Sequence, residues 1–292
     1  MTEVDGVLMI ISCKKYLYDR VVKNKYRLIG DSVFNWKLVY VVADKNISQD
    51  FQFGAHDEIQ SNILIVKCED DYLHLFKKIA FAMRALHVIF KIKKGIIKCD
   101  DDMLFIRKNL QKYLNGPLDI DFSTKSVFKD KYTQTGMESI RVVRDRSIHQ
   151  YLEKSNSDSL RTMLKKNIDT FDKGYINFAT TQKGYGGAGG FRFLSTKASI
   201  IIIQYFEKCG NNQFHKDKET DAYPFMAEDM GHNFVLCKFN IQFVTNPNLY
   251  ANIIWGEDDI QEKIAIHYCF QGQPCLNINN LPKKINDLLI SG

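Results

Sequence analysis

Short apolar runs alternate with helical segments through the first 110 residues, and this alternation constrains the fold more than any other feature. The runs Val7–Ser12, Leu38–Ala43 and Asn62–Val66 are almost wholly apolar, which is typical of strands buried on both faces of a parallel sheet. Leu17–Leu28 and Tyr72–Phe90 carry apolar residues at helical spacing, and Gly95 is expected to end the second helix. The pattern predicts an α/β fold whose helices connect the strands of a mostly parallel, Rossmann-like sheet, an architecture that commonly binds nucleotides.

The chain changes character after this alternating part. Residues 125–175 are rich in Lys, Ser, Thr and Asp, and they include a predicted amphipathic helix at Ile148–Asn167. A further helix is predicted at Lys197–Cys209. We therefore expect a single domain, residues 1–292, that divides into a nucleotide-binding half at 1–110, an insertion or acceptor-side segment at 125–175, and an acceptor and catalytic half at 176–292.

Composition excludes several classes of protein. The net charge of +6 is spread along the chain without a basic block interleaved with aromatics, which argues against nucleic acid as a partner. Seven cysteines without a C-x-x-C pair indicate reduced thiols of an intracellular protein. The apolar runs at 7–11 and 200–203 are too short to span a bilayer. We expect a soluble, cytoplasmic protein without a transmembrane anchor. The abundance of Lys, Ile and Asn indicates an AT-rich genome, that of a bacterium, a protist or a large virus, and a viral protein would act in the host cytoplasm.

Three adjacent carboxylates follow the apolar run at 96–97, namely Asp100, Asp101 and Asp102. Carboxylates this close repel one another and are costly to remove from water, and a cation between them and a diphosphate relieves that cost. Oxygen ligands of this kind select Mg²⁺ or Mn²⁺. A solvated acidic turn is the alternative, but the position directly after a buried strand favours a metal–diphosphate site.

Two later segments are candidates for the rest of a site. Gly184–Gly190 contains five glycines in seven residues, which lets the backbone approach a ligand closely; a flexible turn explains it equally well. Glu228 and Asp229 could supply the base that an attacking hydroxyl needs, or simply favour the first turn of a helix. His267, in the apolar stretch 264–269, is either a satisfied core residue or a third metal ligand.

These segments occur in the order of a known family. Lys-x-Asp-Asp-Asp at 98–102, Gly-Gly-Ala-Gly-Gly at 186–190 and Glu-Asp-Met-Gly at 228–231 resemble the motifs of the β-1,3-galactosyltransferase and fringe-like glycosyltransferases. Residues 70–78 resemble that family's Asp-x-Tyr-x-Asn-Leu-Thr-x-Lys segment, with His74 and Phe76 in place of its Asn and Thr. The resemblance covers roughly residues 7–270 and leaves out 125–175.

The resemblance implies a GT-A fold, a divalent metal (Mn²⁺, or Mg²⁺), a UDP-sugar donor and inversion at the anomeric carbon. By position, Asp102 is similar to the family's metal ligand and Asp229 to its catalytic base. A late metal-binding histidine is also implied; His267 is our choice, and His232 is the competitor. The other residues expected around the donor are Asp100, Asp101, Lys78, Arg20 (with Arg27 as the alternative), Gly187, Ala188, Gly189 and Glu228.

The sequence thus leads to one principal hypothesis and two alternatives. The principal one is an inverting, metal-dependent hexosyltransferase that moves a hexose or N-acetylhexosamine from a UDP-sugar to a hydroxyl of a glycan or glycosylated acceptor, with a β-1,3 linkage. A nucleotidyltransferase would use the same Asp cluster but release pyrophosphate. A carbohydrate-binding protein with this fold would bind without turnover.

Overall fold

The central element of the molecule is a mixed sheet. The structure is a computed structural model that describes residues 1–128, 186–187, 189–215, 217–219, 224–225, 228–252, 260–268 and 277–291. Within this part of the chain nine strands form the sheet in the order β12-β8-β11-β6-β1-β3-β5-β4, and β2 pairs with β3. Their bounds are β1 Thr2–Ile11, β2 Ser32–Val33, β3 Trp36–Ala43, β4 Phe51–His56, β5 Ser61–Val66, β6 Phe90–Asp100, β8 Phe122–Thr124, β11 Phe191–Ser195 and β12 Phe243–Thr245.

The parallel strands β1, β3, β5 and β6 are those that the apolar runs predict. β1 pairs in parallel with β3 and with β6, and β3 pairs in parallel with β5. Helix α2, Leu75–Ile89, connects β5 to β6. The predicted α/β fold with a mostly parallel central sheet is therefore confirmed. β4 was not predicted, because its half-exposed residues lack a clean apolar alternation.

The order of the strands creates a switch point between β1 and β6. From β1 the chain moves outward through β3 to β5, and α2 then returns it to β6 on the other side of β1. The carboxyl ends of β1 and β6 lie in register, with Ile11 opposite Asp100. Ligands of open α/β sheets bind outside the carboxyl ends of the strands at such a point. The Asp triplet therefore begins at the position that the topology favours for a ligand.

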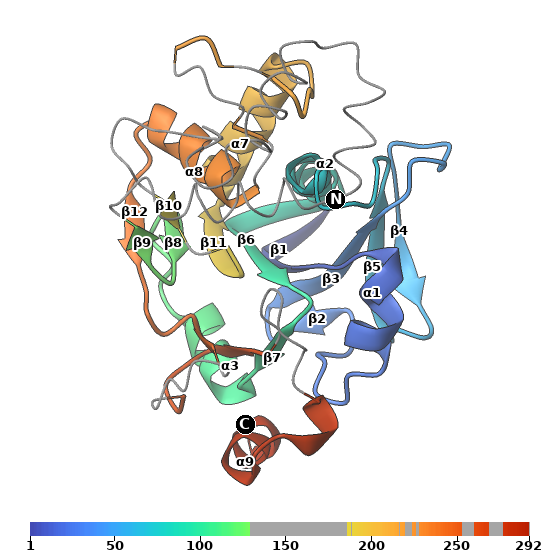
Figure 1. The fold of residues 1–292 in the computed structure, drawn as a ribbon, viewed down its shortest axis with the longest axis vertical. Helices are drawn as coiled ribbons and strands as arrows, with labels where there is room; N and C mark the ends of the chain where they lie inside the picture. The colour runs from blue at the N-terminus through green and yellow to red at the C-terminus, as the bar shows by residue number, and fades with distance from the viewer. Residues whose placement is uncertain are drawn as a thin grey trace, which may run out of the picture.

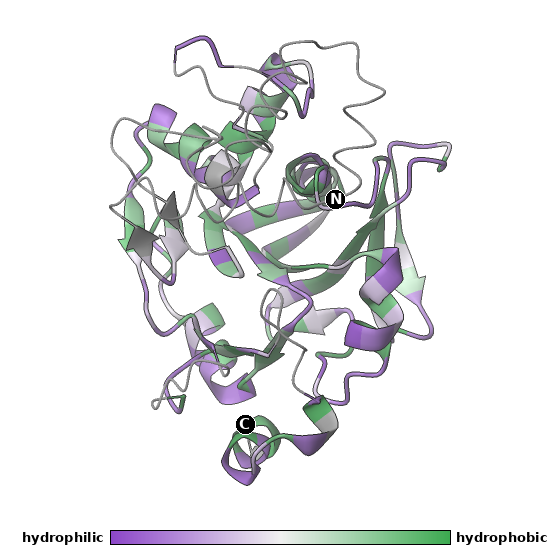
Figure 2. Cartoon of the chain, viewed as in Figure 1, coloured by the Kyte–Doolittle hydropathy of each residue, from purple (hydrophilic) through white to green (hydrophobic). Residues whose placement is uncertain are grey.

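Hydrophobic residues cover both faces of the sheet. In β1, Val7 and Met9 pack into one core while Leu8 and Ile10 pack into the other, as the period of two in a strand requires. Figure 1 shows α2, α7 (Thr196–Lys208) and α8 (Glu228–Lys238) over one face and α3 (Arg107–Asn115) on the other side. Figure 2 shows hydrophobic residues along β3 and β5.

A second, three-stranded sheet lies beyond the Asp triplet. It has the order β13-β14-β7, with bounds β13 Tyr250–Asn252, β14 Ala265–His267 and β7 Met103–Phe105. His267 pairs with Met103 across β14 and β7, so the histidine lies beside the residue that follows the triplet. Helix α9, Lys283–Ser291, packs Ile285 and Leu289 on the third core cluster, which this sheet contributes to. A small pair joins β9 (Val127–Phe128) to β10 (Gly186–Gly187).

Two sequence-based expectations need correction. The helix expected at Leu17–Leu28 is only a short turn, α1 (Lys14–Tyr16), followed by a π-helical turn over Leu17–Val22. It stops because the Asn24 side-chain oxygen accepts from the backbone N–H of Tyr26 and turns the chain. The glycine at 95, expected to end the preceding helix, lies inside β6. A Cβ there would lie 2.2 Å from the backbone oxygen of Leu194 in β11.

Other predictions were confirmed or lie outside the described residues. The helix expected at Lys197–Cys209 is α7, whose N-cap Ser195 accepts from the backbone N–H of Ala198 at 3.0 Å. The helix expected at Ile148–Asn167, most of the segment 125–175, and Ala188 lie outside the described residues. None of the helices in the described part combines the length and apolar character that crossing a bilayer requires.

Candidate active site

Asp101 and Arg20 form an ion pair at the switch point. Ser12, the residue after β1, donates its hydroxyl to Asp101 Oδ2 at 2.6 Å, and Arg20 Nη1 donates to Oδ1 at 3.1 Å. Burial raises the pKa of Asp101 to about 6, although both hydrogen bonds oppose the rise. Both carboxylate oxygens are thus bound by protein groups, and Asp101 fixes the position of Arg20, whose guanidinium also lies 4.1 Å from the Tyr16 ring centroid.

Lys78 and Arg27 support the loops around this pair. Lys78 is buried; its ammonium donates to Asp70 Oδ1 at 2.7 Å and to the backbone oxygen of Ser12. Asp70 Oδ2 also accepts from the backbone N–H of Lys14, so this ion pair fastens the turn that follows β1. Arg27 donates to backbone oxygens at 21, 22 and 58. Both cations are therefore bound to protein groups near the end of β1.

Asp102, the last residue of the triplet, faces His267 of β14. His267 Nε2 lies 3.1 Å from Asp102 Oδ2. Its other ring nitrogen, Nδ1, lies 3.1 Å from Asn252 Oδ1, and an amide oxygen is only an acceptor, so Nδ1 carries the proton. In a neutral imidazole this arrangement leaves the Nε2 lone pair directed toward Asp102. Such an outer hydrogen bond is usual for a histidine that binds metal.

This pair has the chemistry of a site for a hard divalent ion. Asp102 Oδ1 is buried and has no hydrogen-bond partner among the described residues. In this part of the chain no three His, Cys, Asp or Glu side chains gather into a complete metal site. Two protein ligands are what Mg²⁺ and Mn²⁺ require where substrate phosphates and water supply the remaining oxygens. The residues present therefore fit such an ion.

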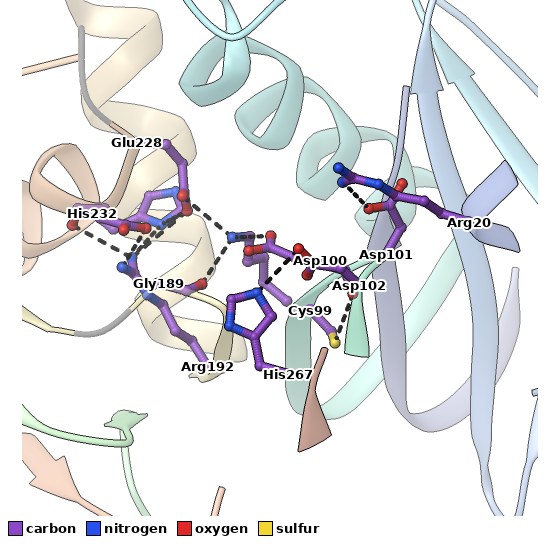
Figure 3. A network of polar contacts seen from close by, with 12 residues as sticks. Arg20, Cys99, Asp100, Asp101, Asp102, Gly189, Arg192, Glu228, His232 and His267 are labelled. Carbon is purple, nitrogen blue, oxygen red and sulfur yellow. Dashed lines mark hydrogen bonds and ion pairs between the residues drawn. The ribbon is translucent and has the colours of Figure 1, made fainter. Parts of the chain in front are cut away.

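Lys98 connects the triplet to the later segments of the chain. Its side chain is fully buried, and Nζ lies 2.7 Å from Asp100 Oδ1, 2.9 Å from the backbone oxygen of Gly189 and 3.3 Å from Glu228 Oε2. An ammonium has three N–H donors, and three acceptors surround it here. One residue thus joins β6, the glycine segment and the start of α8. Figure 3 shows three residues that it contacts, Asp100, Gly189 and Glu228.

The carboxylates of Glu228 and Asp229 lie in the first turn of α8 and differ in exposure. The Glu228 side chain is 4% exposed, and that of Asp229 is 18% exposed. Arg192, fully buried on β11, lies with Nη2 2.7 Å from Asp229 Oδ1 and with Nη1 3.7 Å from Glu228 Oε1. His232 Nδ1 lies 3.1 Å from Glu228 Oε1. Asp229 is therefore the carboxylate of this pair that a substrate can reach.

The environment separates the pKa values of these two acids. Burial raises the pKa of Asp229 well above its usual range, and Arg192 opposes the rise only in part. Burial acts in the same direction on Glu228, but Lys98 and Arg192 outweigh it and hold the pKa of Glu228 well below its usual range. Two acids whose pKa values are pushed apart are suited to different roles, one to proton transfer and one to charge balance.

The glycine segment packs directly against the acids. A Cβ at Gly189 would lie 1.8 Å from Asp229 Oδ1, and a Cβ at Gly190 would lie 2.5 Å from the methyl carbon of Met103. Gly189 must therefore be glycine for Asp229 to keep its position. Gly187 lies in β10, and Ala188 lies outside the described residues.

The expected residues therefore group in three sets. Asp100, Glu228, Asp229 and Gly189 share the Lys98 and Arg192 network; Asp102 and His267 form a pair; and Arg20 holds Asp101. His232 belongs to the first set and not to the Asp102 pair. Sequence reasoning assigned no role to Lys98, Arg192 or Asn252. The available signal was a charged residue inside an apolar strand, Lys98 in β6 and Arg192 in β11.

The fold and the site together define a class: an α/β protein with a carboxylate-rich ligand site at the switch point of a mostly parallel sheet. The family model described as Galactosyltransferase matches residues 33–182, slightly more than half of the chain. The chain belongs to the galactosyltransferase family. This confirms the resemblance stated from the motifs.

Solved structures and curated sequences add two findings. The crystal structure of the glycosyltransferase GlyE in Streptococcus pneumoniae TIGR4 is similar to this chain, with a TM-score of 0.44 and 10% sequence identity. The similarity covers 100% of this chain and 63% of that one, so the chain spans less than two thirds of that structure's length. No curated protein sequence matches the chain.

Proposed function

We propose that this chain is an inverting, metal-dependent glycosyltransferase. It transfers a hexose or N-acetylhexosamine from a UDP-sugar to a hydroxyl of a glycan or glycosylated acceptor, with a β-1,3 linkage as the expected product. Membership of the galactosyltransferase family supports glycosyl transfer as the reaction class. The metal, the nucleotide and the stereochemistry are proposed from the site.

The observation that carries the proposal is the shared contact at Lys98. Asp100 and Glu228 are 128 residues apart in the chain, and both contact the same buried ammonium. This shared contact supports the assignment of the acid pair of α8 and the Asp triplet to one site. Transfer to a hydroxyl needs this arrangement, because the base and the groups that hold the leaving diphosphate must act on opposite sides of one sugar carbon.

Within this proposal Asp229 is the general base. Its raised pKa suits a group that accepts the proton of an attacking hydroxyl near neutral pH, and its partial exposure leaves a path for an acceptor. Glu228 stays ionised and balances the charges of Lys98 and Arg192. Asp100, held by Lys98, faces the donor from β6.

Asp102 and His267 would hold the divalent ion, with Asn252 fixing the histidine tautomer. When bound, such an ion neutralises the charge that develops on the departing diphosphate, so no protein acid is needed there. Arg20, which Asp101 holds in place, would add positive charge for the nucleotide next to the Asp triplet. The protein's own residues do the rest: Asp100 faces the donor, and Asp229 accepts the proton of the attacking hydroxyl.

The test is a screen of UDP-sugars for metal-dependent hydrolysis by the purified chain, because slow hydrolysis needs no acceptor. UDP-galactose, UDP-glucose, their N-acetylamino forms and, separately, UTP are each incubated with Mn²⁺ or with EDTA, and released UDP, free sugar and pyrophosphate are measured. We expect UDP release from at least one donor with Mn²⁺ only. Pyrophosphate release from a nucleoside triphosphate, or UDP binding without any turnover, would contradict the proposal. Asp229→Asn should lose turnover and keep UDP binding, and Asp102→Ala should lose metal-dependent UDP binding.

A further inference from the structure

Arg192 is a fully buried cation on a central strand, and the motifs that define the site do not include it. β11 lies between β6 and β8, so its backbone is fixed on both sides by sheet hydrogen bonds. A guanidinium projecting from such a strand has little freedom to move. Burying it is costly unless acceptors surround it, and this one lies among the groups at the start of α8.

Arg192 contacts Asp229 at two places. Nη2 lies 2.7 Å from Oδ1 of the carboxylate, and Nη1 donates to the backbone oxygen of the same residue at 3.4 Å. Arginine presents its N–H groups in a rigid planar fork, so two contacts to one residue define both position and orientation. Helix α8 is thereby bound to β11 through the residue that we propose as the base.

Gly189 confines the same carboxylate from another side. The space in which a Cβ of residue 189 would lie is occupied by the Asp229 carboxylate, with Oδ1 at 1.8 Å and Oδ2 at 2.2 Å from that position. The carboxylate therefore packs against the glycine backbone while Oδ1 contacts Arg192. Among the described residues, Arg192 is the cation that contacts the Asp229 carboxylate, and the Glu228 side chain shares a hydrogen bond with that carboxylate.

We propose that Arg192 is the positioning residue for the base: it binds Oδ1 and fixes the Asp229 carboxylate against Gly189 in the orientation from which it accepts the proton. This inference rests on the proposed function, since it assigns a role within that reaction. It differs from a purely structural ion pair in one respect. A structural pair affects the folded fraction, whereas a positioning residue affects the turnover of molecules that are folded and have bound donor.

Arg192 also sets the charge that Asp229 experiences. The titratable and charged groups that face Asp229 are Arg192 from β11, Glu228 and His232 from α8, Lys98 and Asp100 from β6, and Tyr250 from β13. Burial raises the pKa of Asp229, and Arg192 is the foremost group that opposes the rise. Loss of the guanidinium charge must therefore raise this pKa further and move the acid limb of the activity profile to higher pH.

The experiment compares Arg192→Lys, Arg192→Met and Gly189→Ala with wild type, and uses Arg84→Met as the control. Arg84 lies in α2 and forms ion pairs with Asp50 and Glu207 at the surface, so its loss should leave turnover unchanged. Hydrolysis of the active UDP-sugar is measured against pH, together with the donor KM, UDP affinity with Mn²⁺, and the thermal midpoint of each variant.

We expect Arg192→Lys to lower kcat by about 10- to 100-fold at unchanged donor KM and UDP affinity, because lysine keeps the charge but loses the fork. Arg192→Met should in addition move the acid limb to higher pH. Gly189→Ala should lower kcat comparably, because its new methyl displaces the carboxylate. If Arg192→Met does not fold, the lysine and alanine variants decide the question.

Three outcomes would overturn the inference. Turnover of Arg192→Lys within twofold of wild type would do so, as would a loss that resides only in KM or UDP affinity. An unmoved acid limb in folded Arg192→Met would also do so. A wild type that hydrolyses no UDP-sugar, or an active Asp229→Asn, overturns the proposed function and this inference with it. An active wild type together with an inactive Asp229→Asn and a fully active Arg192→Lys overturns this inference alone.

Discussion

Replacing Lys98 with methionine tests whether one buried ammonium holds the site together. Methionine has a similar length and keeps the apolar packing of the stem, but it removes the positive charge and all three N–H donors. Asp100 Oδ1, the Gly189 backbone oxygen and Glu228 Oε2 would each lose a partner. Glu228 is 4% exposed, so water cannot fully replace what it loses.

The size of the effect follows from this burial. Breaking a buried ion pair by removal of one partner costs about 3–5 kcal/mol, because the other charge stays buried without compensation. An unfolding entropy of about 2 cal/mol/K per residue gives about 0.6 kcal/mol/K for a chain of 292 residues. The Lys98→Met midpoint should therefore fall by about 5–8 °C near pH 7.5.

The change should depend on pH with a defined sign. Lys98 holds the pKa of Glu228 down, and without it the carboxylate takes up a proton more readily as the pH falls. A protonated Glu228 no longer needs the ammonium, so the difference between wild type and Lys98→Met should shrink between pH 7.5 and pH 5. Scanning calorimetry at both pH values, with circular dichroism to verify the native fold, measures this difference.

The matched control lies on the same strand. Lys93 forms an ion pair with Glu3 at 2.6 Å, but its side chain is 53% exposed. Lys93→Met should therefore leave the midpoint unchanged within about 1 °C. A Lys98→Met midpoint within about 2 °C of wild type at pH 7.5, or a difference that does not shrink at pH 5, would refute the argument that this ammonium compensates buried carboxylates.

Three further predictions concern the metal pair, the glycine of β6 and the base. Asn252→Ala should weaken Mn²⁺ binding by about tenfold in calorimetry with UDP present, because His267 loses the acceptor that fixes its tautomer; unchanged affinity would contradict this role. Gly95→Ala should destabilise the fold by about 1–3 kcal/mol in urea because its Cβ meets the Leu194 carbonyl, whereas Gly54→Ala, with open space at its Cβ, serves as the control. Burial raises the pKa of Asp229, so turnover should fall as the pH drops through that raised value; an acid limb near the ordinary pKa of about 4 would contradict the assignment.

The parallel half of the sheet was predictable because its strands are buried on both faces. Trp36–Ala43 and Ser61–Val66 are nearly continuous apolar runs, and such runs identify central strands without further information. Edge strand β4 alternates weakly and escaped prediction. The short turn after β1 escaped as well, because its length depends on a side-chain hydrogen bond of Asn24 that periodicity does not encode.

The candidate site was predictable where residue type alone indicates chemistry. Three adjacent aspartates and a Glu-Asp pair point to carboxylate chemistry in any fold, and the order of the motifs supports their grouping. No role was predicted for Lys98 and Arg192, because the role of a cation in an apolar strand depends on the acids that contact it. Those acids come from α8, and only the packing of that helix on the sheet brings them within contact distance.

The distribution of charge shows which carboxylates of the site the buried cations neutralise and which one they do not. Five carboxylates, at 100, 101, 102, 228 and 229, lie in this region with three cationic side chains, Arg20, Lys98 and Arg192. Each of these cations contacts a carboxylate other than Asp102, so Asp102 has no ion pair with any of the three. Asp102 also holds the buried oxygen that has no hydrogen-bond partner among the described residues. Because uncompensated buried charge is costly, the divalent ion that we propose beside His267 would supply the positive charge that these cations do not bring to Asp102.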